Sequence, residues 1–201
     1  MNSYKIKIKD KPCFCRVEKG LIIISLWQKE YRPMTYGQII FVPGDGFYVK
    51  LTCKETYPLA RFTEFYEPVY KDSCMEFFAN FNPEESDIYV NFEMNSFGTL
   101  LCGVGDNRHG RKKITEYGLP APEVEASSDE DSWSVTLHAT LSSLESVYGK
   151  LDFKAGYKFK GNMYKCGDET PVLHHLMWNP VEVEEPDFHV PAFFGDFEIV
   201  E

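Results

Sequence analysis

Apolar and polar residues alternate with a period of two along much of this chain, a pattern typical of strands with one buried face. The clearest example is residues 47–53, whose apolar positions are Phe47, Val49, Leu51 and Cys53. Six further segments have strand character and are separated by turn residues: 74–81, 88–94, 99–104, 133–137, 157–164 and 196–200. The pattern predicts an all-β fold, namely a two-sheet antiparallel β-sandwich or jelly roll with one short helix.

The predicted helix covers residues 141–148, where Leu141, Leu144 and Tyr148 have helical spacing and Gly149 follows as a stop. Residues 117–132 collect prolines, acidic residues and two serines, which predicts an exposed, mobile loop. Because the strands on both sides of this loop are needed to complete one sandwich, residues 1–201 are predicted to form a single domain.

The alternation also assigns side chains to faces. In residues 74–81 the odd-numbered positions are apolar and face the core, which places Glu76 on the opposite face. In residues 89–95 the even-numbered positions form the core set, which places Asn91 and Glu93 outside. If the two strands are neighbours, these three side chains share a surface that could hydrogen-bond vicinal hydroxyls. The alternative is the ordinary wet face of a sheet.

Charge and hydropathy exclude some partners. The formal net charge of −10 would repel a phosphate backbone on average, so nucleic acid is not expected as a partner. The one basic cluster, residues 108–113, is typical of a solvated loop. The longest apolar run, residues 21–27, is far too short to cross a bilayer, so no membrane partner is expected.

The six cysteines do not have the spacing of a zinc site, since the closest pair is Cys13 and Cys15. The first ten residues alternate lysine with isoleucine and do not resemble an export signal. We therefore expect reduced cysteines, no required disulfide and a cytoplasmic location, unless an export signal has been removed from the sequence.

The last quarter of the chain has the composition of shaped recognition loops. Residues 161–168, 174–180 and 186–191 gather glycine, proline, asparagine, aspartate and histidine around one tryptophan. Together with 70–78 (YKDSCMEFF) and 91–99 (NFEMNSFGT), these segments resemble the carbohydrate-binding family 9-like proteins, relatives of the family 9 carbohydrate-binding modules. The resemblance implies a β-sandwich that binds a mono- or oligosaccharide and does not cleave it.

The resemblance also implies a site. It places a sugar ring between the aromatic side chains of Tyr70 and Trp178, with Glu76, Asn91 and His175 as polar contacts. From the residues alone, Trp178 is more typical of a core position, because its neighbours Leu176 and Met177 are apolar.

Two positions depart from the pattern of the family. Tyr89 stands where an arginine is expected, and the first aromatic, Tyr70, stands where tryptophan is usual. Related modules carry structural calcium, for which Asp168 and Glu169 are the candidates, although no aspartate-rich spacing demands an ion.

Two other functions compete with sugar binding. A glycoside-cleaving enzyme would pair Glu76 with Glu93, Asp168 or Asp187 across a glycosidic bond. A haem-binding sandwich would use Met163, His174 or His175 as ligands, although no haem-attachment motif is present.

Overall fold

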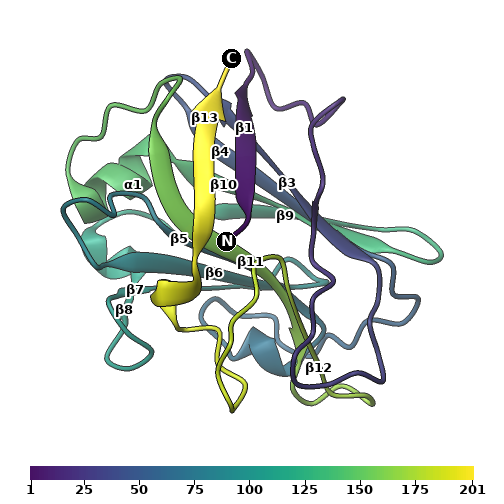
Figure 1. Ribbon diagram of the computed structural model, residues 1–201. Coiled ribbons are helices and arrows are strands. Elements are labelled where there is room, and N and C mark those ends of the chain that lie inside the picture. The colour runs from purple at the N-terminus through teal and green to yellow at the C-terminus, as the bar shows by residue number, and fades with distance from the viewer.

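The computed structural model describes every residue from 1 to 201 and is built mainly of strands (Figure 1). The strands are β1 Ser3–Ile8, β2 Gly20–Leu21, β3 Thr35–Val42, β4 Gly46–Cys53, β5 Cys74–Asn80, β6 Tyr89–Asn95, β7 Leu100–Gly105, β8 Lys112–Lys113, β9 Glu123–Ser128, β10 Trp133–Thr140, β11 Lys158–Gly167, β12 His174–Met177 and β13 Gly195–Val200. One α-helix, α1, spans Leu141–Tyr148, and the 3-10 helices are η1 Val69–Lys71, η2 Ile114–Tyr117 and η3 Pro191–Phe193. The prediction of a β fold with one short helix is confirmed. None of the helices has the length and apolar character needed to span a membrane.

Hydrogen bonds join the strands in the order β8-β7-β6-β5-β11-β13-β1-β3-β4-β10-β9, with β12 beside β11 and β2 beside β3. In Figure 1 the sheet curls so that β5 and β6 cross the direction of β1 and β13. β1 runs parallel to both β13 and β3. The prediction of two antiparallel sheets is therefore not confirmed, because the first and last strands link the two halves into one mixed sheet. Alternation fixes which face a residue occupies but says nothing of strand direction.

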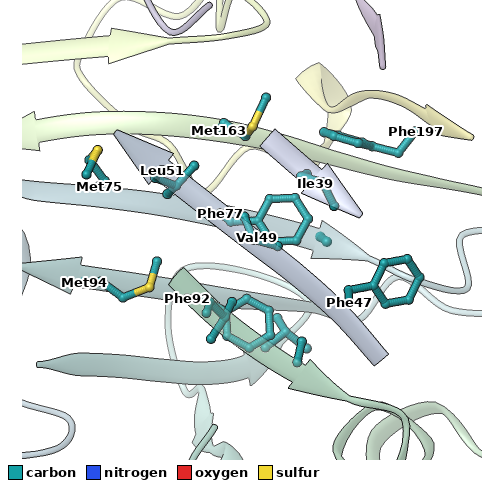
Figure 2. Packing of buried hydrophobic residues seen from close by; sticks show 14 of the residues in the cluster. Ile39, Phe47, Val49, Leu51, Met75, Phe77, Phe92, Met94, Met163 and Phe197 are labelled. Atoms are coloured by element: carbon teal, nitrogen blue, oxygen red, sulfur yellow. The ribbon is translucent and has the colours of Figure 1, made fainter. Parts of the chain in front are cut away.

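The main core fills the inside of the curled sheet. Figure 2 shows Phe47, Val49 and Leu51 of β4 packed near residues of the crossing strands, among them Phe77 and Phe92. All five of these side chains are buried. Burying a side chain of this size contributes about 1.5–3 kcal/mol, so this layer is the main source of stability.

The seven strand segments predicted from alternation all appear as strands, with ends that differ by a few residues. The predicted helix is also confirmed, and its ends have physical causes. The hydroxyl oxygen of Thr140 accepts a hydrogen bond from the backbone N–H of Ser143 at 3.1 Å, which caps the N-terminus. Gly149 follows the last helical residue with φ of 75°, a conformation that glycine adopts without steric cost.

Two local predictions are wrong. The expected mobile loop at 117–132 contains β9, which pairs with β10 from the Trp133–Ser128 pair to the His138–Glu123 pair. It is an exposed edge strand whose alternation is limited to Val124 and Ala126, and only Val124 packs against the main core. Residues 161–167, expected in a recognition loop, belong to β11, which lies between β5 and β13. A Cβ on Gly161 would lie 2.6 Å from the carbonyl oxygen of Phe78, so this glycine permits close strand packing.

The face assignment of β5 and β6 is confirmed, but the outer face is not wet. The predicted core positions lie in the main cluster, whereas Phe78 and Tyr89 of the outer face belong to a second buried cluster. Segments far along the chain cover this face, among them Val181, Phe188 and Phe194. The segment between β12 and β13, yellow in Figure 1, and the β7–β8 hairpin both lie on the lower side of the sheet. All six cysteines are free.

Candidate functional site

A cavity of about 460 Å³ opens on the outer face of β5, β6 and β11. Its floor is formed by strand residues, namely Glu76, Phe78, Asn91, Glu93 and Cys166. Its walls come from loops and strand ends: Tyr66, Tyr70, Leu101, Arg108, His109, Gly110, Arg111, Asp168, His175, Pro186, Asp187, Phe188 and His189. A cavity of this size, with polar groups on a rigid floor and rings in its walls, is suited to a small organic ligand.

The floor is set by strand register. Glu76 of β5 is the direct partner of Glu93 of β6, and Phe78 is the partner of Asn91. Glu76, Asn91 and Glu93 are 2%, 1% and 4% exposed. Buried polar groups are costly unless they are hydrogen-bonded, so the partners of these three residues decide what the floor can do.

A hydrogen-bonded chain orients the carboxylate of Glu93. Arg111 Nε donates to Asn91 Oδ1 at 2.8 Å, and Asn91 Nδ2 donates to Glu93 Oε1 at 2.7 Å. The other Glu93 oxygen, Oε2, is buried and makes no hydrogen bond within the protein. Glu93 Oε2 is thus the one oxygen of these hydrogen-bonded side chains that has no partner in the protein.

Arg111 is held by its remaining donors. Its Nη2 donates to the carbonyl oxygens of Tyr89 at 2.9 Å and Gly103 at 3.2 Å, and its Nη1 donates to that of Asn107 at 2.7 Å. The guanidinium carbon lies 4.1 Å from the centroid of the Tyr89 ring. Because the N–H groups of the guanidinium are all used in this way, Arg111 offers no free donor to the cavity. Its role is to position Asn91.

Burial shifts the acid-base equilibria of the floor. Burial raises the pKa of Glu93 to about 7, against the opposing effects of Asn91 and Arg111. Burial, the Cys166 thiol and the facing Glu93 raise the pKa of Glu76 well above its usual value. The S–H of Cys166 donates to Glu76 Oε1 at 2.9 Å. Near neutral pH the floor therefore carries less negative charge than two carboxylates would suggest.

His189 closes one side of the cavity. Its Nδ1 lies 2.8 Å from the hydroxyl of Tyr89, and its Nε2 lies 4.0 Å from Glu93 Oε1. Burial, reinforced by the positive charges of Arg111 and Arg108, lowers the pKa of His189 to about 3. The ring is neutral at ordinary pH and can donate with one nitrogen and accept with the other.

Interactions between residues that are far apart in the sequence hold the cavity walls in place. Arg108 of the β7–β8 loop forms an ion pair with Asp187 at 2.9 Å. Tyr66, also in the wall, has φ of 73°, a left-handed conformation that is rare for a bulky side chain. Its backbone N–H donates to the carbonyl oxygen of Leu100 at 2.9 Å, which holds it there. Such strain is commonly retained where a residue has a functional position.

Tyr70 and His175 line the cavity together with Glu76 and Asn91, so four of the five predicted site residues meet there. Tyr70 is 36% exposed, which leaves its ring accessible to a ligand. His175 is held by two contacts, Nδ1 to Gln28 Oε1 at 2.8 Å and Nε2 to Asp168 Oδ1 at 3.0 Å. Contact between these four residues and a ligand is still a prediction.

The position of Trp178 shows that the predicted aromatic clamp is wrong. Its ring is 5% exposed, packs against Phe197 at a centroid distance of 4.9 Å, and does not line the cavity. A Cβ on Gly20 would lie 3.3 Å from the indole and one on Gly195 would lie 2.5 Å from it, so two glycines make room for the ring. The indole belongs to the main core, as its apolar sequence neighbours indicated, and it cannot clamp a sugar against Tyr70.

The residues considered for calcium are engaged with other groups. Glu169 pairs with Arg61 at 3.0 Å and with Lys71 at 3.0 Å, and Asp168 contacts His175. These two carboxylates therefore do not form an oxygen cage of the kind that calcium prefers.

The residues considered for haem are also engaged. Met163 is fully buried in the main core. His174 has Nε2 2.6 Å from Lys165 Nζ and Nδ1 2.8 Å from the carbonyl oxygen of Val172. Neither of these two side chains faces the cavity. His175 does, but both of its ring nitrogens are engaged, Nδ1 with Gln28 and Nε2 with Asp168, so the arrangement offers no support for haem ligation.

The sequence interpretation missed Arg111, His189, Tyr66 and Phe188 as residues of the site. Arg111 lies in the basic segment that was expected to be a solvated loop, yet its guanidinium is inserted beside β6. It occupies the region where Tyr89 replaces the arginine expected from the resemblance. The nearest sequence signal was its position directly after Gly110, at the end of a hairpin that returns toward β7.

The family model described as carbohydrate-binding family 9 matches residues 9–199. No curated protein sequence matches the chain. The crystal structure of a candidate carbohydrate-binding protein from Bacteroides uniformis has a TM-score of 0.83 and 26% identity, and the match covers 98% of each chain.

Two further structures are of family 9 modules from Caldicellulosiruptor kristjanssonii. One, in complex with cellotriose, has a TM-score of 0.71 and 9% identity, covering 99% of this chain and 94% of the other. The second, in complex with glucose, has a TM-score of 0.70 and 10% identity, covering 98% and 95%. At such identities the likeness concerns the fold.

Proposed function

Because the chain belongs to carbohydrate-binding family 9, we propose that it binds a mono- or oligosaccharide in the cavity over β5, β6 and β11 without cleaving it. The observation that carries the proposal is the cavity floor. The Arg111–Asn91–Glu93 chain fixes Glu93 Oε2 as a buried acceptor without a protein partner. A sugar hydroxyl can donate to this oxygen when Glu93 is ionised and accept from it when Glu93 is protonated.

The walls supply the second part of sugar recognition. Tyr66, Tyr70 and Phe188 line the cavity, and an aromatic ring packs well on the apolar face of a pyranose. Two modules with the same fold were solved with cellotriose and with glucose, so glucose-based sugars are the first ligands that we propose for this chain. A role in glycan breakdown, as a binding module beside a catalytic partner, is part of the same proposal.

Cleavage of a glycosidic bond is the competing function. The usual mechanism needs one ionised carboxylate and one protonated carboxyl on opposite sides of the bond. Here Glu76 and Glu93 are direct neighbours on adjacent strands, and burial raises the pKa of both. Two neutral or half-neutral groups on one floor favour hydrogen bonding to hydroxyls over attack on a sugar.

Replacing Tyr70 with alanine tests the stacking part of the proposal. We expect the affinity for the sugar to fall about tenfold, because the variant loses about 1.4 kcal/mol of ring contact. The measurement is calorimetric titration with glucose, cellobiose and cellotriose. Tyr57→Ala is the matched control, since Tyr57 is 92% exposed and does not line the cavity. Equal affinities for the two variants would remove Tyr70 from the site.

Replacing Arg111 with lysine tests the floor. Lysine keeps the positive charge but has no planar fork, so it cannot hold Asn91 and two backbone carbonyls together. We expect the affinity for the same sugars to fall about tenfold through the misplaced Asn91 and Glu93. Lys112→Ala, an exposed neighbour on β8, should bind as the unmodified protein does. Unchanged binding by Arg111→Lys would show that the hydrogen-bonded chain does not matter for the ligand.

A further inference from the structure

Three metal-binding side chains meet at the floor of the cavity. Cys74 and Glu76 project from the same face of β5, and Cys166 is the direct register partner of Cys74 on β11. The two sulfur atoms and a carboxylate oxygen all lie within 4.8 Å of one another. All three residues are buried, and their positions follow from two neighbouring strands of the sheet. The cluster is therefore preformed by the fold.

The donor set selects the kind of ion. Two thiolates and one carboxylate suit zinc, whereas calcium prefers a shell made of oxygen alone. We propose that Cys74, Glu76 and Cys166 bind one zinc ion whose fourth position faces the cavity. With zinc–sulfur bonds of about 2.3 Å, tetrahedral ligand atoms lie about 3.8 Å apart. The present separations are at most 4.8 Å, and Cys166 Sγ is 2.9 Å from Glu76 Oε1, so binding needs side-chain shifts of about an ångström, inward for the wider pairs and outward for this one.

A second observation points to the same place. Glu93 lies directly opposite Glu76 on β6, is 4% exposed, and has an Oε2 atom with no partner in the protein. A water or ligand hydroxyl on the zinc could donate a hydrogen bond to this oxygen. Outer carboxylates of this kind commonly orient the groups bound to a metal. Glu76 and Cys166 line the cavity, which gives the ion a path from solvent.

The zinc site goes beyond sugar binding and does not depend on it. The spacing of the three ligands along the chain does not predict such a site, because Cys166 lies 90 residues after Glu76. The pair of half-buried Cys13 and exposed Cys15 is the competing source of thiolates. Any test must therefore distinguish the two pairs of cysteines.

The test uses the full chain purified under reductant, stripped with a chelator and then titrated with zinc or cobalt chloride. We expect one zinc ion per chain by elemental analysis, and a thiolate-to-cobalt charge-transfer band with the visible absorption of tetrahedral cobalt. The double variant Cys13→Ser with Cys15→Ser should keep both signals. Cys166→Ser should lower zinc affinity about a hundredfold or more, measured by competition with a chromophoric chelator.

Because Cys166→Ser could disturb the sheet, circular dichroism checks its fold, and Glu76→Gln provides a second variant that keeps both cysteines. A loss of zinc affinity in Glu76→Gln with the fold intact would support the site. The proposal is overturned if the stripped protein binds no zinc or cobalt, if the signals follow Cys13 and Cys15, or if Glu76→Gln and a folded Cys166→Ser bind zinc as the unmodified protein does.

Discussion

Replacing Trp178 with alanine is expected to lower the free energy of unfolding by about 3–5 kcal/mol. The ring is 5% exposed and packs between Tyr4, at a centroid distance of 6.4 Å, and Phe197, at 4.9 Å. Gly20 and Gly195 leave space that only a large ring fills, so alanine would create a cavity that the neighbouring backbone cannot easily close.

Urea denaturation of the two proteins measures this difference, with Trp27→Ala as the matched control. Trp27 is half-buried and its indole Nε1 donates to the carbonyl oxygen of Val183 at 2.9 Å, so its loss should cost less. Sugar affinity of folded Trp178→Ala should be unchanged, because the ring does not line the cavity. A stable variant with weakened sugar binding would contradict this and return Trp178 to the binding site.

Replacing Glu93 with glutamine is expected to stabilise the protein at alkaline pH. Burial raises the pKa of Glu93 to about 7 in the folded state, above the ordinary value of 4.5. As pH rises from about 4.5 to 7, the unfolded chain loses this proton before the folded protein does, so the stability of the unmodified protein falls across that window. A shift of this size corresponds to roughly 3 kcal/mol, and glutamine, which does not ionise, avoids the loss.

The measurement is the free energy of unfolding of both proteins at pH 4, 6 and 8. The difference between them should grow with pH and level off above about pH 7, where Glu93 is ionised in both the folded and the unfolded state. Asn91 can still donate to the glutamine oxygen, so the variant keeps this hydrogen bond. Glu130→Gln, on the exposed turn after β9, should show no such growth. A difference that is the same at pH 4 and pH 8 would mean that Glu93 titrates normally.

Much of the fold could be predicted because alternation reports burial directly. The assignment of Glu76 and Asn91 to one face of β5 and β6 needed only the period of two. Strand β3 was not predicted, because nearly all of its residues are buried, polar Thr35 and Gln38 included, so its sequence shows no alternation. Strand β9 was missed for the opposite reason, since only Val124 is partly buried and the rest of the strand is exposed.

The site was harder to predict, because it depends on register and on loops. Tyr70, Glu76, Asn91 and His175 meet in one cavity, as the resemblance implied. Trp178 does not, because its segment turns into the main core between two glycines. No local pattern could indicate this, since the space around the ring is set by residues far away in the chain.

Arg111 and the cysteines illustrate the same point. Arg111 lies in a basic loop with no periodicity, and only the close return of the β7–β8 hairpin brings it over Tyr89. The pairing of Cys74 with Cys166 follows from the antiparallel register of β5 and β11, which the sequence does not specify. Spacing rules for metal sites find ligands that are close in sequence, and these are not.

The central claim is that a sugar binds on the outer face of β5, β6 and β11. Its most direct test is a titration of isotope-labelled protein with cellobiose, followed by amide chemical shifts in NMR spectra. We predict that the largest changes occur at Tyr66, Asn91, Arg111 and Phe188 around the cavity, and that Ser127 on the edge strand β9, which does not line the cavity, does not change. No change with glucose, cellobiose or cellotriose, or changes centred on β9 and β10, would contradict the account.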